Sequence, residues 1–240
     1  MSTTSIRLFV ETALHAGENV NLREAQAHYL ANVMRLGAGD TLRLFNGTQG
    51  EWRAEMVSAG RKAVDLRVLE QTREHEAAPD CWLCFALLKR QKTDLVVEKA
   101  TELGVRVIQP VITARTQADH VNLERLRAIA LEAAEQCERL TVPEIREPVS
   151  LAKMMQNWPA RTLYVADERR DAGVLRAEPG AAKPCALLVG PEGGFTSVEL
   201  DGIAGTPLVK RVSLGARILR AETAAIAGLA LLLCADPAQE

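Results

Sequence analysis

LLVGPEGGF (residues 187–195) and VSLGARILRAETA (residues 212–224) are the two stretches of sequence that decide the expected fold. Each starts as an apolar run typical of a buried strand, continues into a glycine-bearing loop and leads towards a helix. In open α/β sheets, ligands bind at the loops that follow the carboxyl ends of the strands. Two such loops, about twenty residues apart, therefore predict one shared pocket.

The composition is that of a soluble globular protein. The chain has 240 residues, of which 48% are hydrophobic and 25% charged, which allows one large domain or two modest ones. The polar start, residues 1–7, carries no signal-peptide pattern, and the longest apolar run, residues 224–235, is too short to span a bilayer. We therefore expect a cytoplasmic protein without a membrane partner. A net charge of −2 argues against a general nucleic-acid binder but leaves room for a local basic face.

The five cysteines predict reduced core thiols rather than a metal site. Cys81 and Cys84 have the spacing of a CxxC motif, but they lie in the strand-like run CWLCFALL, where residues three apart point to opposite faces. No second CxxC pair follows to complete a zinc site. An odd number of cysteines, most of them inside apolar runs, also suits a reducing cytosol. We expect no bound metal.

Residues 1–73 are rich in short strand patterns and tight turns. Apolar and polar residues alternate in several segments, and Asn46-Gly47 is a strong hairpin turn. The expected elements are a helix over 22–34 and strands over 7–10, 41–45, 51–57 and 63–69. Such strands predict a small β-barrel. The polar segment 74–80, which contains Pro79, is the expected linker.

From residue 81 onwards, strand patterns alternate with helix patterns. The expected strands are 81–89, 105–113, 162–166, 185–189 and 208–212, and the expected helices are 92–103, 122–139 and 221–234. This alternation predicts an α/β fold, with a mostly parallel sheet flanked by helices. Two local signals support it: Gly104 is placed to end the helix before it, and the stretch from Thr196 to Glu199 fits a capping box.

The glycine loop at 190–194 matches neither common phosphate-binding motif. GPEGG is not followed by the Gly-Lys-Ser/Thr of a Walker loop, and it is not the GxGxxG fingerprint of a nucleotide-dependent oxidoreductase. By itself the loop is readable as a tight connection with glycines at positive φ. The second loop favours a site, because Arg217, Arg220 and Glu222 crowd next to Gly215. Such crowding forms either a salt-bridge network or a polar ligand site.

Together, GPEGG and the later LGARILRAETA (214–224) resemble the SPOUT superfamily of knotted methyltransferases. Within it, the chain resembles the ribosomal RNA small subunit methyltransferase E family, which methylates N3 of a uridine in 16S rRNA. KATELGV (99–105), EAAEQCER (132–139) and VMRL (33–36) extend the resemblance to nearly the whole chain. In the last motif Met34 replaces the usual leucine, which is a change that conserves volume.

The resemblance implies a two-domain architecture. Residues 81–240 would form a SPOUT-type methyltransferase domain with a parallel sheet and a trefoil knot, after a PUA-like, RNA-binding β-barrel over 1–73 and a linker over 74–80. It implies S-adenosyl-L-methionine as the cofactor, held bent in the knot, and a homodimer with the active site near the subunit interface. The substrate would be 16S rRNA, and the mild net charge favours recognition within the assembled 30S subunit.

The resemblance also assigns roles to individual residues. The cofactor would lie between two walls formed by Leu188, Gly190, Pro191, Glu192, Gly193, Gly194, Leu214, Gly215, Ile218 and Leu219. Uridine N3 must lose a proton, so a cation or a base would assist. The candidates are the cations Arg217 and Arg220 and the carboxylate Glu222, which is either a base or a buried partner of Arg220. The expected RNA contacts are Arg7, Arg35, Lys89, Arg90, Lys92 and Arg115.

Two other functions remain open at the level of sequence. One is a knotted methyltransferase with a different target, either a ribose 2′-hydroxyl or a tRNA base. The other is a non-catalytic RNA-binding protein of ribosome assembly, although such a protein has no need of a cofactor pocket.

Overall fold

The computed structural model describes residues 6–60, 63–117, 120–167, 172–175 and 184–234, and these form two compact units. The N-terminal unit contains residues 1–77 together with 134–141, and the C-terminal unit contains 78–133 and 142–240. Nothing in the sequence indicated that 134–141 belong with the N-terminal unit. The expected linker bounds, 74–80, stay a prediction.

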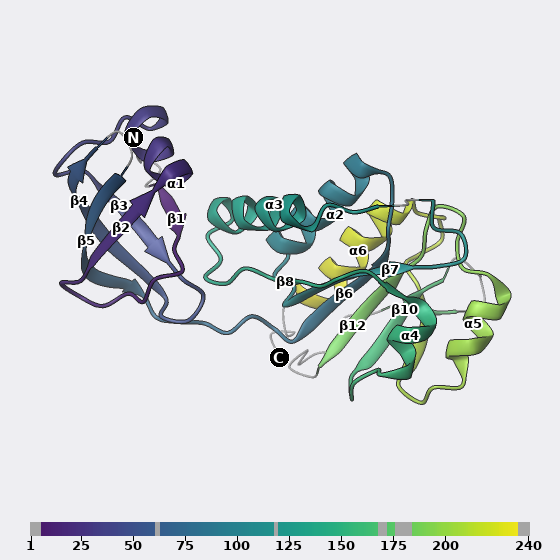
Figure 1. The fold of residues 1–240 in the computed structure, drawn as a ribbon. Helices are drawn as coiled ribbons and strands as arrows, with labels where there is room; N and C mark the ends of the chain where they lie inside the picture. The colour runs from purple at the N-terminus through teal and green to yellow at the C-terminus, as the bar shows by residue number, and fades with distance from the viewer. Residues whose placement is uncertain (1–5, 61–62, 118–119, 168–171, 176–183, 235–240) are drawn as a thin grey trace. The chain divides into compact units, whose positions relative to one another are not determined.

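The N-terminal unit is built on a sheet in which the described strands follow the order β1-β3-β4-β5-β2 (Figure 1). Strand β1 pairs parallel with β3, and the other neighbours are antiparallel. Leu42 and Leu44 alternate inwards along β3 and are fully buried. The elements are β1 (Arg7–Phe9), β2 (Asn19–Arg23), α1 (Glu24–His28), the π-helix η1 (Tyr29–Val33), β3 (Thr41–Phe45), β4 (Glu51–Ala59) and β5 (Ala63–Arg73).

The helix expected over 22–34 is wrong at its start. Residues 19–23 form strand β2, which pairs antiparallel with β5, and Val20 and Leu22 point into the core while their neighbours are exposed. The alternation of apolar and polar residues over 19–23 therefore determines a strand here, and the helical pattern takes effect only after it. The helical part begins at Glu24 and ends in a π-helical turn.

The strands described in the C-terminal unit form one wholly parallel sheet, in the order β11-β13-β10-β12-β6-β7-β8 with β9 beside β7. The α/β prediction is thus confirmed. The strands are β6 (Cys81–Ala86), β7 (Val107–Ile112), β8 (Glu144–Ile145), β9 (Val149–Ser150), β10 (Thr162–Ala166), β11 (Gly173–Val174), β12 (Cys185–Val189) and β13 (Val209–Ser213). The helices are α2 (Arg90–Glu102), α3 (Leu123–Gln136), α4 (Leu151–Gln156), α5 (Ser197–Ala204) and α6 (Ala221–Leu233).

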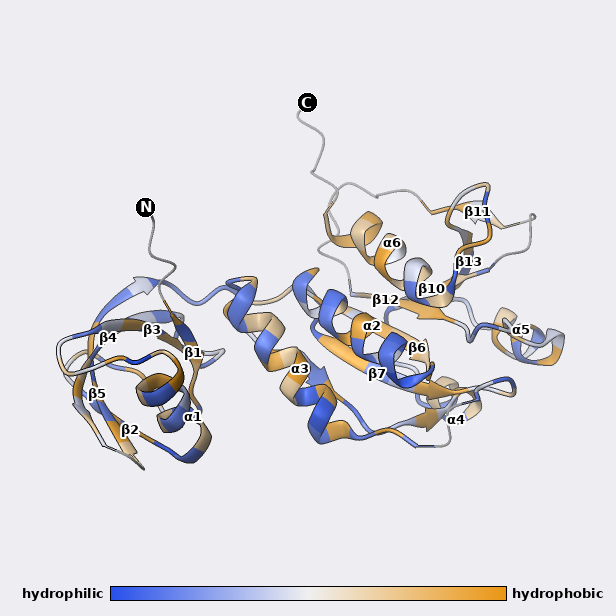
Figure 2. Cartoon of the chain, turned by 90° about the horizontal axis from the view of Figure 1, so that it is seen from above, coloured by the Kyte–Doolittle hydropathy of each residue, from blue (hydrophilic) through white to orange (hydrophobic). Residues whose placement is uncertain are grey.

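The two faces of this sheet carry separate apolar cores. One core joins alternate residues of β6 and β12 to α2, α3 and α6, and the other joins the opposite residues to α4 and α5. Along β12, Leu187 belongs to the first core and its neighbour Leu188 to the second. The central strands are coloured as largely hydrophobic in Figure 2. Burial on both faces is typical of parallel sheets, and it explains why these strands read as unbroken apolar runs.

Helix α6 lies unusually close to the central strands. A Cβ atom added at Gly228 would lie 2.6 Å from Cδ2 of Leu187, so a larger residue here would force the buried Leu187 side chain to shift. Helix α6 contacts β12, β6 and α2, which places its first turn beside the carboxyl ends of the central strands. Among the described residues, no helix is both long and apolar enough to cross a membrane.

The buried cysteines pack in the sheet. Cys81 and Cys84 point to opposite faces of β6, as expected, and Cys81 is the register partner of Cys185 on β12. Burial raises the pKa of the Cys84 thiol to about 12. All five cysteines are free.

Candidate functional site

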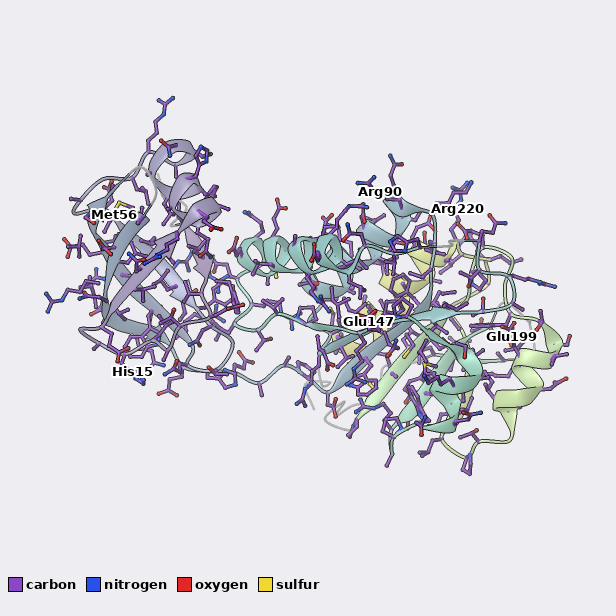
Figure 3. The ribbon with its side chains drawn as sticks, viewed as in Figure 1. His15, Met56, Arg90, Glu147, Glu199 and Arg220 are labelled. Atoms are coloured by element: carbon purple, nitrogen blue, oxygen red, sulfur yellow. The ribbon has the colours of Figure 1, made fainter. Side chains whose placement is uncertain are left out.

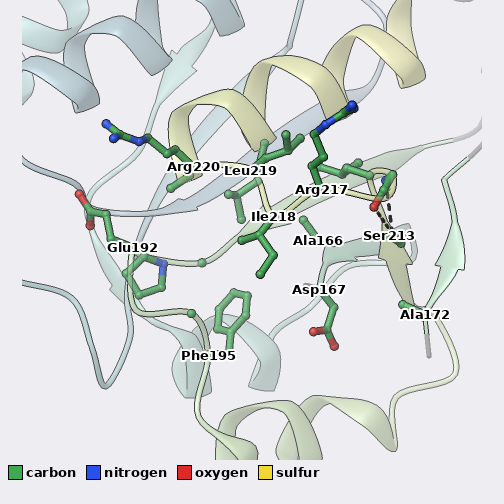
Figure 4. A pocket seen from close by; sticks show the side chains of 18 of the residues that line it. Ala166, Asp167, Ala172, Glu192, Phe195, Ser213, Arg217, Ile218, Leu219 and Arg220 are labelled. Atoms are coloured by element: carbon green, nitrogen blue, oxygen red, sulfur yellow. Dashed lines mark hydrogen bonds between the residues drawn. The ribbon is translucent and has the colours of Figure 1, made fainter. Parts of the chain in front are cut away.

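A cavity of about 980 Å³ lies where β10, β12 and β13 end, between the two glycine loops (Figure 4). The loop after β12, residues 190–196, forms what we call the first wall, and the loop after β13, residues 214–220, forms the second wall. The pocket predicted from these two stretches is therefore present. The lining residues are Lys92, Ala166, Asp167, Ala172, Val174, Val189, Gly190, Pro191, Glu192, Gly194, Phe195, Leu200, Ser213, Leu214, Gly215, Ala216, Arg217, Ile218, Leu219, Arg220, Ala221 and Ala224.

The first wall makes a sharp turn at Gly194, and the ring of Phe195 that follows packs against the core. Gly194 has a φ of +66°, a conformation that L side chains rarely adopt, and its amide donates to the carbonyl of Pro191 at 2.9 Å. Phe195 lies in the cavity lining and packs against the core on the α4 and α5 side. A Cβ at Gly190 would lie 3.0 Å from this ring, so the start of the loop is also tightly placed.

The carboxylate of Glu199 holds the far end of the first wall. Oε2 accepts hydrogen bonds from the amide and the hydroxyl of Thr196, at 2.8 and 2.9 Å, and the Thr196 hydroxyl caps the amide of Glu199. The predicted capping box is thus confirmed. Oε1 accepts from the amide of Ala114 at 2.8 Å, which ties in the loop after β7. Burial alone would raise the pKa of Glu199, but these donors outweigh it, and the pKa is lowered.

Arg115 braces the same wall from outside the cavity. Its guanidinium donates to the carbonyl of Gly193 at 2.5 Å. A Cβ atom added at Gly193 would lie 3.3 Å from Cδ of Arg115. Gly193, expected to line the cofactor, is therefore absent from the cavity lining and faces Arg115 instead.

The second wall is more exposed than the first. Gly215 has a φ of +120°, and its amide donates to the hydroxyl of Ser213 at 3.3 Å. Ile218 reaches into the cavity with 77% of its surface exposed, and Leu219 beside it is half-buried (Figure 4). A large exposed aliphatic side chain next to a cavity is suited to contact a flat apolar group.

Three charged residues meet at the edge of the cavity. The ammonium of Lys92, in the first turn of α2, lies 3.2 Å from Oε1 of Glu192 and 3.5 Å from Oε2 of Glu222. Glu222 was expected to be either a base or a partner of Arg220, and its charge partner is Lys92. Glu222 is not in the cavity lining, whereas Arg217 and Arg220 are. In Figure 4, Arg220 lies on the side of Glu192 and Arg217 on the side of Ser213.

Leu188 is placed differently from the expectation. It is fully buried in the core between β12 and helices α4 and α5, and it is absent from the cavity lining. The remaining expected cofactor residues do line the cavity: Gly190, Pro191, Glu192, Gly194, Leu214, Gly215, Ile218 and Leu219.

Asp167 is a cavity residue that sequence reasoning missed. It follows β10, and its buried carboxylate accepts from Nε of Arg211 at 2.6 Å. A signal was present, because a polar residue directly after a predicted strand is placed at the ligand-binding edge of a parallel sheet. Phe195 and Leu200 were also missed.

The residues expected to contact RNA fall into distinct environments. Arg7 is only 6% exposed, and its guanidinium is occupied by protein groups: Oε2 of Glu51 at 2.5 Å and the carbonyls of Ala134, Glu135 and Arg139. Arg7 therefore fastens residues 134–141 to the N-terminal sheet, and its contact with RNA stays a prediction.

The other expected RNA contacts are more open. Arg35 is exposed on the N-terminal unit with a φ of +56°. Lys89 and Arg90 are exposed where α2 begins, and Figure 3 shows Arg90 and Arg220 on the same side of the C-terminal unit. Arg115 is exposed beside the first wall, while Lys92 belongs to the cavity.

Two family models match the chain. Residues 75–233 match an RNA methyltransferase domain, and residues 22–69 match an RNA methyltransferase PUA domain. The first match spans more than half of the chain and contains both cavity walls. The second falls on the N-terminal sheet and supports its PUA-like character.

Curated relatives and solved structures agree with these models. The ribosomal RNA small subunit methyltransferase E of Rickettsia conorii is 36% identical over 93% of each chain, and that of Synechocystis is 34% identical over 88% of this chain and 71% of the relative. The Neisseria gonorrhoeae enzyme of the same name, solved with S-adenosyl methionine, superimposes with a TM-score of 0.86 at 27% identity, covering 94% of this chain and 95% of that one. A Legionella pneumophila protein solved with the same cofactor gives a TM-score of 0.85 at 30% identity, covering 97% and 98%. With both walls of the cavity inside the matched domain, the chain belongs to the ribosomal RNA small subunit methyltransferase E family of RNA methyltransferases.

Proposed function

We propose that this protein transfers a methyl group from S-adenosylmethionine to N3 of a uridine in 16S ribosomal RNA. The observation that carries the proposal is the cavity between the two glycine-loop walls, in a chain whose relatives are named for ribosomal RNA methylation and are solved with this cofactor. The uridine and its N3 position come from the resemblance of the two loop motifs.

The residues present fit S-adenosylmethionine. Adenine is flat and largely apolar, and Ile218, Leu219 and Phe195 offer it apolar contacts while backbone amides of both loops offer hydrogen bonds. The residues that would hold the cofactor are Gly190, Pro191, Glu192, Gly194, Leu214, Gly215, Ile218 and Leu219. Leu188 and Gly193 support the first wall from behind.

The bound cofactor supplies a methyl group already activated by a sulfonium. The chain has to orient the uracil, exclude water and stabilise the negative charge that develops when N3 loses its proton. Arg220, which lines the cavity and is exposed, is the proposed cation, with Arg217 as the second. Because deprotonation leaves charge on the ring, replacing Arg220 by alanine should lower turnover about 100-fold, while cofactor affinity changes little.

The exposed basic residues beside the cavity would contact the RNA backbone. Lys89, Arg90 and Arg115 are placed for this role, and Arg35 would add a contact from the PUA-like unit. The target base has to leave its stack to reach the cavity. We propose that it is recognised within the assembled 30S subunit, by a homodimer, in the cytoplasm.

The proposal includes the trefoil knot of the family. Strand β13 lies two strands away from β12, yet α6 returns to β12 and β6 at the centre of the sheet. Between β13 and α6 the chain forms the second wall, which lines the same cavity as the first wall. A crystal structure that traces residues 162–234 without a break tests the threading.

The activity is tested with 30S subunits and free 16S rRNA from cells that lack the protein. We expect S-adenosylmethionine-dependent formation of 3-methyluridine, read by nucleoside mass spectrometry, and more of it on 30S subunits than on free RNA. A 2′-O-methylated nucleoside would instead support a different target. Cofactor or RNA binding without methylation of either substrate would support the assembly factor.

A further inference from the structure

Lys92 joins three segments that are far apart in the sequence. It lies in the first turn of α2, Glu192 lies in the first wall, and Glu222 lies in the first turn of α6. Its ammonium is 3.2 Å from one carboxylate and 3.5 Å from the other. No relative's name and no motif assigns a role to this contact.

The surroundings of Glu222 show why the cation matters. The Glu222 side chain is 14% exposed, and among the residues that the structure describes its buried Oε2 atom has no hydrogen-bond partner, while the ammonium of Lys92 lies 3.5 Å from it. A carboxylate in such a place is costly unless a cation compensates it. Lys92 is also at the positive end of the α2 dipole, where a cation is disfavoured. The carboxylates of Glu192 and Glu222 therefore offset the unfavourable interaction between the Lys92 cation and the helix dipole.

We propose that Lys92 is a positioning residue that fixes the first wall to the start of α6 and so sets the width of the cofactor cavity. The inference rests on the proposed function for the identity of the cofactor. Glu222 then serves as a fixed anion for Lys92 rather than as the base that removes the uridine proton. Lys92 contacts protein carboxylates instead of RNA phosphates.

The primary test compares two lysines of the same helix. Lys99 also lies between two carboxylates, Glu98 at 2.8 Å and Glu102 at 2.7 Å, but it is outside the cavity, so Lys99→Met is the matched control. We expect Lys92→Met to weaken S-adenosylmethionine binding about tenfold in calorimetry, because the wall is no longer held in the binding geometry. Lys99→Met should stay within about twofold, and binding of 16S rRNA should be unchanged in both variants.

A rescue and a double-mutant cycle separate positioning from general damage. Lys92→Arg keeps the charge and can span both carboxylates, so it should recover most of the lost affinity. Glu192→Gln and Glu222→Gln should each weaken cofactor binding, and adding either one to Lys92→Met should cost less than the two single effects combined. Glu192 is in the loop, so its substitution leaves the core intact.

A second readout needs no cofactor. In the free protein, hydrogen exchange at the amides of residues 192–196 should be faster in Lys92→Met than in Lys99→Met, because the wall has lost one of its ties. If the wild-type protein fails to bind S-adenosylmethionine, the proposed function fails while this readout still decides the role of Lys92. Unchanged exchange, or unchanged cofactor affinity together with weaker RNA binding, would overturn the proposal and make Lys92 an RNA contact.

Discussion

The two walls of the cavity have the same ingredients, a strand followed by a glycine loop, but they are held very differently. The first wall is tied by Glu199 to the loop after β7, by Arg115 at Gly193, and by Lys92 at Glu192. In the part of the chain that the structure describes, the hydrogen bonds recorded for residues 214–219 run only to Ser213. The first wall is therefore held by polar contacts with the protein. In the second wall, Leu214 and Leu219 pack against the core, and Ile218 is left exposed for a ligand.

Because of this difference, substitutions in the two walls should affect different quantities, the free energy of unfolding and the affinity for the cofactor. A substitution behind the first wall should lower the free energy of unfolding, because the contacts exist in the free protein. A substitution of Ile218 on the second wall should lower cofactor affinity alone, because this side chain is exposed until the cofactor binds. Four experiments examine this contrast, from the largest expected effect to the smallest.

Leu188→Ala should have the largest effect on stability. Leu188 is fully buried beneath the first wall, and removing its side chain leaves a cavity that the packed sheet cannot close. We expect a loss of about 3 kcal/mol in the free energy of unfolding, measured by urea denaturation. At temperatures where the variant is folded, its affinity for S-adenosylmethionine should be close to normal. A stable variant with weak binding would show that Leu188 touches the cofactor after all.

Glu199→Ala removes the central tie of the first wall. The amides of Thr196 and Ala114 lose their acceptor, so we expect about 2 kcal/mol of destabilisation. The rate of hydrogen exchange at the amides of residues 192–196 should rise towards the rate in the second wall, so that the two walls no longer differ in protection. If the first wall stays protected, Arg115 and Lys92 are sufficient to hold it.

Ile218→Ala should show the opposite behaviour. Its side chain is 77% exposed in the free protein, so the melting temperature should hardly change. Burial of this side chain against the cofactor is worth about 1.5 kcal/mol, which corresponds to about a tenfold loss of affinity in calorimetry. A clear loss of stability would mean that the second wall is packed against protein even without a ligand.

The pH dependence of stability gives the smallest of the four effects. The pKa of Glu199 is lowered in the folded protein from an ordinary value of 4.5, because its backbone donors outweigh the effect of burial. Its contribution is therefore fully present above that value and is lost as the pH falls through the lower folded pKa. The stability difference between wild type and Glu199→Gln should shrink between about pH 5 and pH 3 in urea titrations. A difference that grows on acidification would reverse the sign of the shift.

Local signals in the sequence predicted the elements around the site well. The strands over 162–166 and 185–189 have the expected bounds, Gly104 has the positive φ of a helix-ending residue, and the capping box from Thr196 to Glu199 is complete. Each of these depends on neighbours within a few residues. The two-residue strands β8, β9 and β11 and the six-residue helix α4 were missed, because so few residues carry too little periodicity, and β2 was missed because its last residues were assigned to the helix that follows.

The ties across the chain could not be predicted in the same way. The bond from Ala114 to Glu199 spans 85 residues, and the ion pair from Lys92 to Glu192 spans 100. The burial of Leu188 behind the cavity could not be predicted for a different reason. Strand β12 is buried on both faces, so its apolar run does not reveal which residues face the cavity. Arg7 was expected to contact RNA because of its charge and its place in the family pattern. The carbonyls that its guanidinium binds lie about 130 residues away in the sequence, so no local pattern reveals them.

The distribution of thiols provides two natural attachment points for spectroscopic probes. Cys81, Cys84 and Cys185 are buried in the parallel sheet, whereas Cys137 and Cys234 are exposed. Cys137 belongs to the N-terminal unit and Cys234 to the C-terminal unit. Maleimide dyes should therefore label one position in each unit without any engineered residue. Energy transfer between them would follow the distance between the PUA-like unit and the methyltransferase unit as RNA binds.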